Sequence, residues 1–152
     1  MRWPQGCASP KIAQRANRDE LKINVVPSNR SDALDLDVLE SMLGHDVGII
    51  AITWVPTNGG LVNPAQEVGR IVRKYGVSYL LDACQALGQM PIDVGALGGS
   101  FRSATGRTFM RGLRGTGILF VAAKWPDVLE PMMIDRPFCC AVDGAQSIYI
   151  VQ

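Results

Sequence analysis

Three short polar segments of this 152-residue chain carry side chains suited to binding one small anionic ligand. They are Thr57-Asn58, Asp82-Ala83-Cys84-Gln85 and Ser103 to Thr105, and each follows an apolar run. An aspartate can pair with a protonated ring nitrogen, an amide can bond a phenolate oxygen, and hydroxyl groups can hold a phosphate. Ligands of open α/β sheets bind beyond the carboxyl ends of the strands. The three segments therefore predict one site, provided that each apolar run is a strand.

The segments that must position these groups alternate between strand-like and helix-like patterns. Strands are expected at 22–27, 47–55, 77–81, 100–104 and 115–122, and helices at 35–43 and 64–75. Asp32 or Asp35 is expected to cap the first helix, and Gly76 to close the second. The β-branched run 47–55 predicts a strand buried on both faces. Such alternation predicts an α/β fold with three layers and a mainly parallel sheet.

The composition is that of one soluble globular domain. Apolar residues make up 47% of the chain, charged residues 19%, and the formal net charge is +1. We expect no nucleic-acid partner, because Lys and Arg are not clustered. We expect no membrane span, because the longest apolar run falls short of about 20 residues, and no secretory signal. The cysteine spacing fits no zinc site, so reduced thiols of a cytoplasmic protein are expected at Cys7, Cys84, Cys139 and Cys140.

Each polar motif taken alone has another explanation. Asp82 could simply cap a helix, and Cys84 could be a buried, inert thiol. The glycine pattern from Gly112 to Gly117 suggests a phosphate loop, but it precedes a strand and lacks the Lys-Ser/Thr of a P-loop. Arginine side chains bind phosphate or carboxylate groups, or they are solvated at a surface, and both alternatives stay open for Arg107, Arg111 and Arg114. His45 is the only histidine, which argues against a catalytic triad or a zinc site.

Taken in order, the motifs resemble the class V aminotransferase family, whose fold-type I pyridoxal-phosphate (PLP) enzymes include the cysteine desulfurases. Residues 52–64 (ITWVPTNGGLVNP) are similar to the family's segment after the cofactor-face strand, and 79–85 (YLLDACQ) to its Asp-x-x-Gln motif. Residues 103–121 resemble its lysine loop and the strand that follows. The resemblance covers about residues 25–135 of the single partial domain 1–152, with divergent ends at 1–10 and 136–152. The chain thus looks like a fragment of the PLP-binding large domain.

The resemblance implies a role for each polar group. Asp82 would pair with the pyridine nitrogen of PLP, and Gln85 would bond the phenolic oxygen. Thr105 stands where the family has a phosphate-binding hydroxyl. Thr57 or Asn58 would face the other edge of the ring or the substrate, and the sequence does not choose between them.

Position 108 departs from the family pattern. The family has its Schiff-base lysine there, after Gly-Arg, whereas this chain has Thr108, whose hydroxyl cannot form an imine. Arg107 replaces the histidine of cysteine desulfurases, and its role stays open. Ser100 replaces an acidic residue found in many relatives. None of the lysines lies in this loop: they are Lys11, Lys22, Lys74 and Lys124.

Two hypotheses follow for the function. In the first, the chain is a PLP-dependent, class V aminotransferase-like protein that acts on an amino-acid substrate by transamination, epimerisation or C–S cleavage. This polypeptide would itself be inactive, because Thr108 replaces the lysine. In the second, it is a truncated or degenerate remnant that serves as a cofactor-binding or interaction module. The segments Pro-Thr-Asn-Gly-Gly and Arg-Gly-x-Arg-Gly-Thr-Gly resemble those of the family's epimerase and C–S lyase branches. In either case exposed apolar surface predicts a homo-oligomer, expected to be a dimer.

Overall fold

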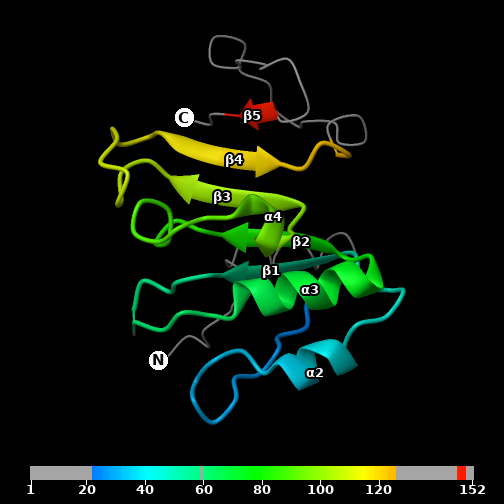
Figure 1. The fold of residues 1–152 in the computed structure, drawn as a ribbon. Helices are drawn as coiled ribbons and strands as arrows, with labels where there is room; N and C mark the ends of the chain where they lie inside the picture. Colours follow the sequence, from blue (N-terminus) through cyan, green and yellow to red (C-terminus); the bar gives the residue numbers. More distant parts are fainter. Residues whose placement is uncertain (1–21, 59, 126–146, 150–152) are drawn as a thin grey trace.

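One five-stranded sheet organises residues 22–58, 60–125 and 147–149, the part of the chain that this computed structural model describes (Figure 1). Its strands lie in sequence order, and they are β1 (Ile49–Thr53), β2 (Ser78–Asp82), β3 (Phe101–Thr105), β4 (Gly117–Val121) and β5 (Ser147–Tyr149). The first three strands are parallel, whereas β4 and β5 are each antiparallel to the preceding strand. The α/β class predicted from the sequence is therefore confirmed.

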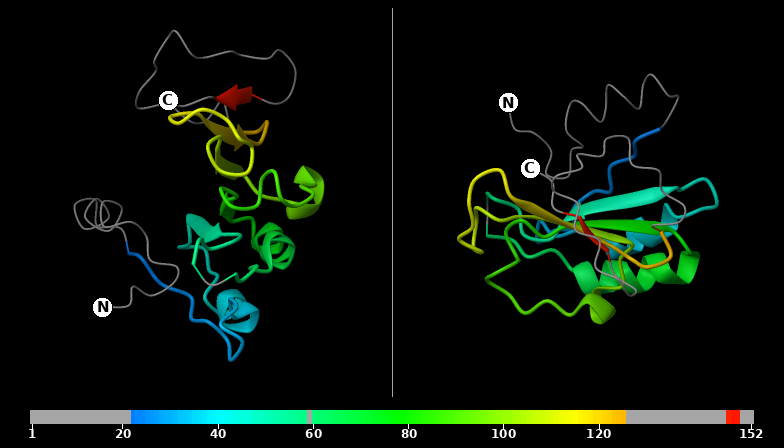
Figure 2. Two further views of the ribbon diagram at one scale, coloured as in Figure 1. Left: turned by 90° about the vertical axis from the view of Figure 1, so that its left-hand side faces the viewer. Right: turned by 90° about the horizontal axis from the view of Figure 1, so that it is seen from above.

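Two helical crossovers connect the parallel strands. Helix α3 (Ala65–Tyr75) joins β1 to β2, and the short helix α4 (Val94–Leu97) joins β2 to β3. Both connections step the same way along the sheet, and right-handed crossovers of that kind place their helices on the same face. Figure 2 shows α3 and α4 together on one face of the sheet. Helix α2 (Leu36–Ser41) precedes β1 and packs against α3.

Helix α3 follows the predicted spacing of apolar residues. Ala65, Val68 and Val72 are buried against the sheet. Gly76 ends the helix at a φ of 68°, a left-handed conformation that glycine adopts without strain. Tyr75 was expected on the same apolar face but is 42% exposed. Its hydroxyl instead donates a hydrogen bond of 3.1 Å to Oε1 of Glu40 on α2.

Asp35 caps α2, which settles the choice between the two aspartates. Its Oδ1 accepts the backbone N–H groups of Asp37 and Val38, each at 3.1 Å. An N-cap side chain of this kind satisfies amide groups that have no partner inside the helix. Asp32 instead takes a φ of 59° in the preceding turn.

Two expectations for the strands were wrong. Residues 22–27 do not form a strand; they are extended and mostly exposed, without a neighbouring strand among the described residues. The strand within 47–55 is not buried on both faces, because Ile49 is 54% exposed. β1 lies at the edge of the described sheet, and the described helices cover only one of its faces. β-Branched residues favour an extended backbone, but neighbours elsewhere in the fold decide whether the strand is buried.

The core lies between the sheet and helices α3 and α4. Its fully buried side chains include Tyr79 and Leu81 from β2, Val68 and Val72 from α3, and Leu97 from α4. The Tyr79 hydroxyl donates to the carbonyl of Ala65 at 3.2 Å, so its burial leaves no donor unsatisfied. Residues 94–97 lie between the expected strands 77–81 and 100–104, where no helix was expected. A single helical turn forms there because Asp93 accepts the amides of Gly95 and Ala96.

Candidate functional site

The carboxyl ends of the three parallel strands meet at one edge of the sheet (Figure 1). Thr53 is paired with Asp82, and Asp82 is paired with Ser103, so the ends of β1, β2 and β3 form one row. β4 begins at the same edge, where Gly117 is opposite Thr105. This register brings together the loops that carry the polar segments singled out in the sequence.

Asp82 is the last residue of β2 and is partly buried. Its Oδ1 accepts the backbone N–H of Cys84 at 2.9 Å, which fixes the carboxylate at the start of the following turn. Backbone bonds on both sides hold this point: Trp54 N donates to the Asp82 carbonyl at 2.9 Å, and Ala83 N donates to the Ser103 carbonyl at 2.8 Å. Burial, and then the hydrogen bond and charge of Asp82, raise the pKa of the Cys84 thiol. The thiol is therefore a neutral donor beside the carboxylate at neutral pH.

Gln85 reaches the loop that follows β1. Its Nε2 donates to the Thr57 hydroxyl at 3.3 Å, which joins two of the predicted site residues. Asn63 closes the same loop, because its Nδ2 donates to the Thr53 carbonyl at 2.8 Å. Asn58 is exposed and makes no hydrogen bond with the described residues. The structure thus brings Thr57, rather than Asn58, into contact with the Gln85 amide.

Thr108 links the loops that follow β2 and β3. Its Oγ1 lies 2.7 Å from the carbonyl oxygen of Cys84, 3.1 Å from that of Thr105, and 3.5 Å from the Thr105 hydroxyl. A hydroxyl has one proton to donate, and the shortest contact directs it to Cys84. The side chain at position 108 is thus adjacent to the turn that holds Asp82, but its donor is committed to the backbone.

Glycines that the sequence reasoning passed over allow these loops to approach closely. Gly88 has a φ of 91°, and a Cβ there would lie 2.8 Å from the backbone of Phe109. A Cβ on Gly106 would lie 2.2 Å from Oγ1 of Thr116. A glycine in a turn-rich stretch is the only sequence signal of such contacts. The partner in each contact depends on the tertiary fold.

Four other positions noted in the sequence take no part in these side-chain contacts. Arg107, Arg111 and Arg114 are exposed and form no ion pair with any residue of the described ranges. Ser100 is buried just before β3, and so lies at the opposite edge of the sheet from Asp82. The exchange of an acidic residue for Ser100 therefore does not alter the surroundings of the candidate site.

Neither a membrane-spanning helix nor a metal-binding cluster is present in the described ranges. No helix there has the length and hydrophobicity needed to cross a membrane. No group of three His, Cys, Asp or Glu side chains there converges to hold a metal ion.

Comparison with known proteins identifies the family. The aminotransferase class-V family matches residues 7–148. A probable cysteine desulfurase of Methanothermobacter thermautotrophicus is 30% identical over 112 residues, which span 74% of this chain and 28% of that protein. The 2-aminoethylphosphonate–pyruvate transaminase of Vibrio cholerae is 33% identical over 121 residues, or 78% of this chain and 32% of that protein.

A solved structure with the same fold confirms the architecture. The apo cysteine desulfurase of Thermococcus onnurineus superposes with a TM-score of 0.77 at 24% identity, covering 92% of this chain and 36% of that protein. This chain thus spans about a third of the length of the proteins that it matches. The order of its motifs, its strand register and these matches agree, and the chain belongs to the class V aminotransferase family.

Proposed function

We propose that this chain is a PLP-binding part of a class V aminotransferase-like protein, and that it binds the cofactor without a covalent bond and does not itself catalyse amino-acid chemistry. One observation carries the proposal. The family's cofactor lysine is replaced by Thr108, whose hydroxyl donates to the Cys84 carbonyl at 2.7 Å. A side chain in this position holds two loops together and offers no amine.

The chemistry of the remaining side chains fits PLP. Asp82 offers a fixed carboxylate for the protonated pyridine nitrogen, and Gln85 an amide for the phenolic oxygen. Thr105 offers a hydroxyl for the phosphate. All three belong to loops or strand ends at the same edge of the sheet. When it is bound, PLP supplies an electron sink for carbanions formed at the Cα of amino acids.

The residues of this chain favour binding over turnover. The Asp82 carboxylate would keep the ring nitrogen protonated, since an adjacent negative charge favours the charged form. The raised pKa of the Cys84 thiol keeps it neutral, so it is not a ready nucleophile or base. The Thr108 hydroxyl is a poor base and cannot move the Cα proton as an amine would.

Transamination, epimerisation and C–S cleavage of an amino-acid substrate are activities that we assign to a complete member of the family. A homodimer of the complete protein would bury apolar surface that this part leaves exposed. A cytoplasmic location fits the reduced state of Cys84, the free cysteine of the described residues. The alternative function is that of an interaction module without cofactor, which the exposed apolar residues of the loop after β3 would favour: Phe109, Met110 and Leu113.

Equilibrium dialysis of PLP against the purified chain tests the binding. We expect one saturable site, and we expect Asp82→Asn to weaken it by about tenfold or more, the loss of one charge-assisted hydrogen bond. The side-chain oxygen of asparagine can still accept a hydrogen bond from the Cys84 backbone N–H, so the turn is retained. Asp37→Asn removes an exposed carboxylate from α2 and should leave the affinity unchanged. An equal loss in both variants, or no saturable binding by the native chain, contradicts the proposal.

Borohydride reduction in the presence of PLP tests the part played by position 108. The native chain should give no specific adduct, whereas Thr108→Lys should trap PLP at that position, as peptide mapping would show. Thr108→Arg is the matched control, because it adds a cation without a primary amine. A unique adduct on Lys22, Lys74 or another native lysine contradicts the assignment of position 108. Failure of Thr108→Lys alone, with binding retained, places the defect in segments outside this chain.

A further inference from the structure

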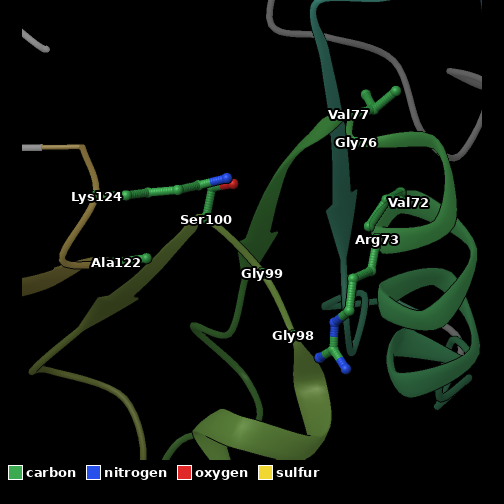
Figure 3. A pocket seen from close by; sticks show the side chains of 9 residues that line it. All are labelled: Val72, Arg73, Gly76, Val77, Gly98, Gly99, Ser100, Ala122 and Lys124. Atoms are coloured by element: carbon green, nitrogen blue, oxygen red, sulfur yellow. The ribbon is translucent and has the colours of Figure 1, made fainter.

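A second recess lies at the opposite edge of the sheet from the candidate PLP site. It is an open recess with a volume of about 200 Å³, located where α3 ends, where β2 and β3 begin, and just beyond the end of β4 (Figure 3). Its walls include Arg73, Gly76, the turn Gly98-Gly99-Ser100, and Lys124. Five residues of strand separate it from the ends of β2 and β3 that carry Asp82 and Thr105, or about 16 Å.

The charged side chains that line this recess are both positive. Arg73 extends from the last turn of α3 along Gly98, and Lys124 approaches from the segment after β4 (Figure 3). No Asp or Glu lines the recess. Within the described ranges the ion pairs are Arg70–Glu67 and Lys74–Glu40, so neither Arg73 nor Lys124 is neutralised there.

Hydrogen-bond donors also remain available in the recess. Arg73 Nη2 donates to the Gly95 carbonyl at 3.2 Å, which fixes the guanidinium and leaves its other N–H groups. Ser100 is only 7% exposed, and its Oγ accepts the Tyr79 amide at 3.4 Å. Its hydroxyl proton has no acceptor among the described residues. A buried hydroxyl that lacks an acceptor favours an external one.

Glycine shapes the wall between the two cations. A Cβ on Gly98 would lie 2.2 Å from Arg73 Nη2, and a Cβ on Gly99 would lie 3.0 Å from the Tyr79 ring. Only a wall without side chains lets the guanidinium lie against this turn. The end of α3 contributes a partial negative charge of roughly half a unit. Two full positive charges outweigh it, and Gly76 N already bonds the carbonyls of Val72 and Arg73.

From this lining we infer that the recess binds a phosphate group, either free or on a small phosphomonoester, between Arg73 and Lys124 with Ser100 as a third donor. The site is independent of PLP and of residue 108, so it stands or falls apart from the function proposed above. A phosphate is favoured over a simple halide because an oxyanion with several acceptor atoms can bond a guanidinium, an ammonium group and a hydroxyl at the same time.

Amide chemical-shift mapping of the native chain tests the site. Titration with inorganic phosphate at constant ionic strength should shift the amides of Gly98, Gly99, Ser100 and Lys124 in a saturable manner. Chloride should not shift them, and the amides of Asp82 and Thr105 should stay in place. A parallel titration with glycerol 3-phosphate separates the two sources: tighter binding than that of free phosphate assigns the site to a phosphomonoester. Weaker binding assigns it to the free ion. No saturable shift at this edge overturns the inference.

Charge variants provide the second test. Arg73→Gln and Lys124→Gln should each weaken phosphate binding about tenfold, the loss of one charge-assisted bond. Ser100→Ala should weaken it less. Arg70→Gln, one turn earlier on the exposed face of α3, is the matched control and should have no effect. An equal loss in Arg70→Gln would show general charge attraction only and would overturn the site. Both substitutions replace exposed side chains. If either variant fails to fold, the chemical-shift map of the native chain still tests the site.

Discussion

At position 108 a short hydroxyl side chain joins the loops that follow β2 and β3. The Cys84 carbonyl that accepts its proton belongs to the turn that positions Asp82. This side chain adds a hydrogen bond that holds the turn in place, and under the proposed function it stands where the family has an amine. Such a bond, between partly buried groups, contributes about 1 kcal/mol to the free energy of folding.

The contribution of this bond is measurable without cofactor. Thr108→Val should lower the free energy of unfolding by about 1 kcal/mol, because the Cys84 carbonyl loses its donor. Urea denaturation followed by circular dichroism measures the change. Thr108→Ser keeps the hydroxyl and should stay closer to the native value. A Thr108→Val variant that is as stable as the native chain would show that the hydrogen bond does not stabilise the fold.

Helix α3 is the element that couples the sheet to α4. Gly69 lies on its buried side, where a Cβ would be 2.0 Å from the carbonyl oxygen of Leu97. The backbones of α3 and α4 are therefore in contact at this point. Leu97 itself is fully buried in the core. The glycine therefore sets the distance between α3 and the crossover that leads to β3.

Gly69→Ala should destabilise the chain by about 1–3 kcal/mol, the usual cost of overpacking. This outcome opposes helix propensity, which favours alanine over glycine by about 1 kcal/mol. Gln66→Ala, on the exposed face of the same helix, should change stability by less than about 0.5 kcal/mol. Thermal melts of the two variants compare these effects. A stabilised Gly69→Ala variant would contradict the close contact between α3 and α4.

The contact between α2 and α3 includes an ion pair whose contribution to stability should depend on pH. Lys74 Nζ donates to Glu40 Oε1 at 2.7 Å, and this bond lowers the pKa of Glu40 and raises that of Lys74. A lowered carboxyl pKa stabilises the fold above the unfolded pKa, and the contribution disappears as pH falls through the folded value. A raised lysine pKa stabilises below the unfolded pKa, and the contribution disappears as pH rises through the folded value.

The native chain should lose stability as pH falls from neutral to below the carboxyl range. Glu40→Gln should make this loss smaller than it is in the native chain. Denaturation midpoints at several pH values would measure it. Both charged groups are exposed, so salt should shrink the difference between native and variant. Glu67→Gln on α3 is the control, because Glu67 lies 3.8 Å from its partner Arg70, whereas Glu40 lies 2.7 Å from Lys74. An unchanged pH profile in Glu40→Gln would show that the pair does not stabilise the fold.

On the scale of the whole molecule, one edge and one face of the sheet have few partners among the described residues. β1 pairs only with β2, and Ile49 on β1 is 54% exposed. An unpaired strand edge with apolar side chains favours association with other chains. This chain also spans about a third of its relatives, whose additional length supplies further surface.

We therefore expect concentration-dependent self-association in sedimentation velocity experiments. Ile49→Lys should shift the distribution toward the monomer, because a lysine on an edge strand opposes pairing with a second edge. Val94→Lys adds the same charge on α4, away from the unpaired edge strand, and should have the smaller effect. A native chain that stays monomeric at high concentration would contradict this expectation.

The sequence alone predicted most of the local elements and supplied the residue types of the candidate site. Helices α2 and α3 follow from apolar spacing and from Gly76, which act over a few residues, whereas the choice of Asp35 over Asp32 as the cap came from the structure. The motif order around Asp82 and Gln85 indicated the family, which the match over residues 7–148 confirmed. The absence of an amine at position 108 is likewise a fact of the sequence, since it depends on residue type and on nothing else.

The tertiary structure alone decided which residues meet and which faces are covered. The exposed face of β1, the antiparallel course of β4 and the contact of Gly88 with Phe109 depend on residues distant in sequence. So does the bond from Thr108 to the Cys84 carbonyl, 24 positions away. Apolar periodicity shows that a segment needs a buried face, but it carries no record of the partner. That partner is chosen by strand register and crossover geometry, which exist only once the whole sheet has formed.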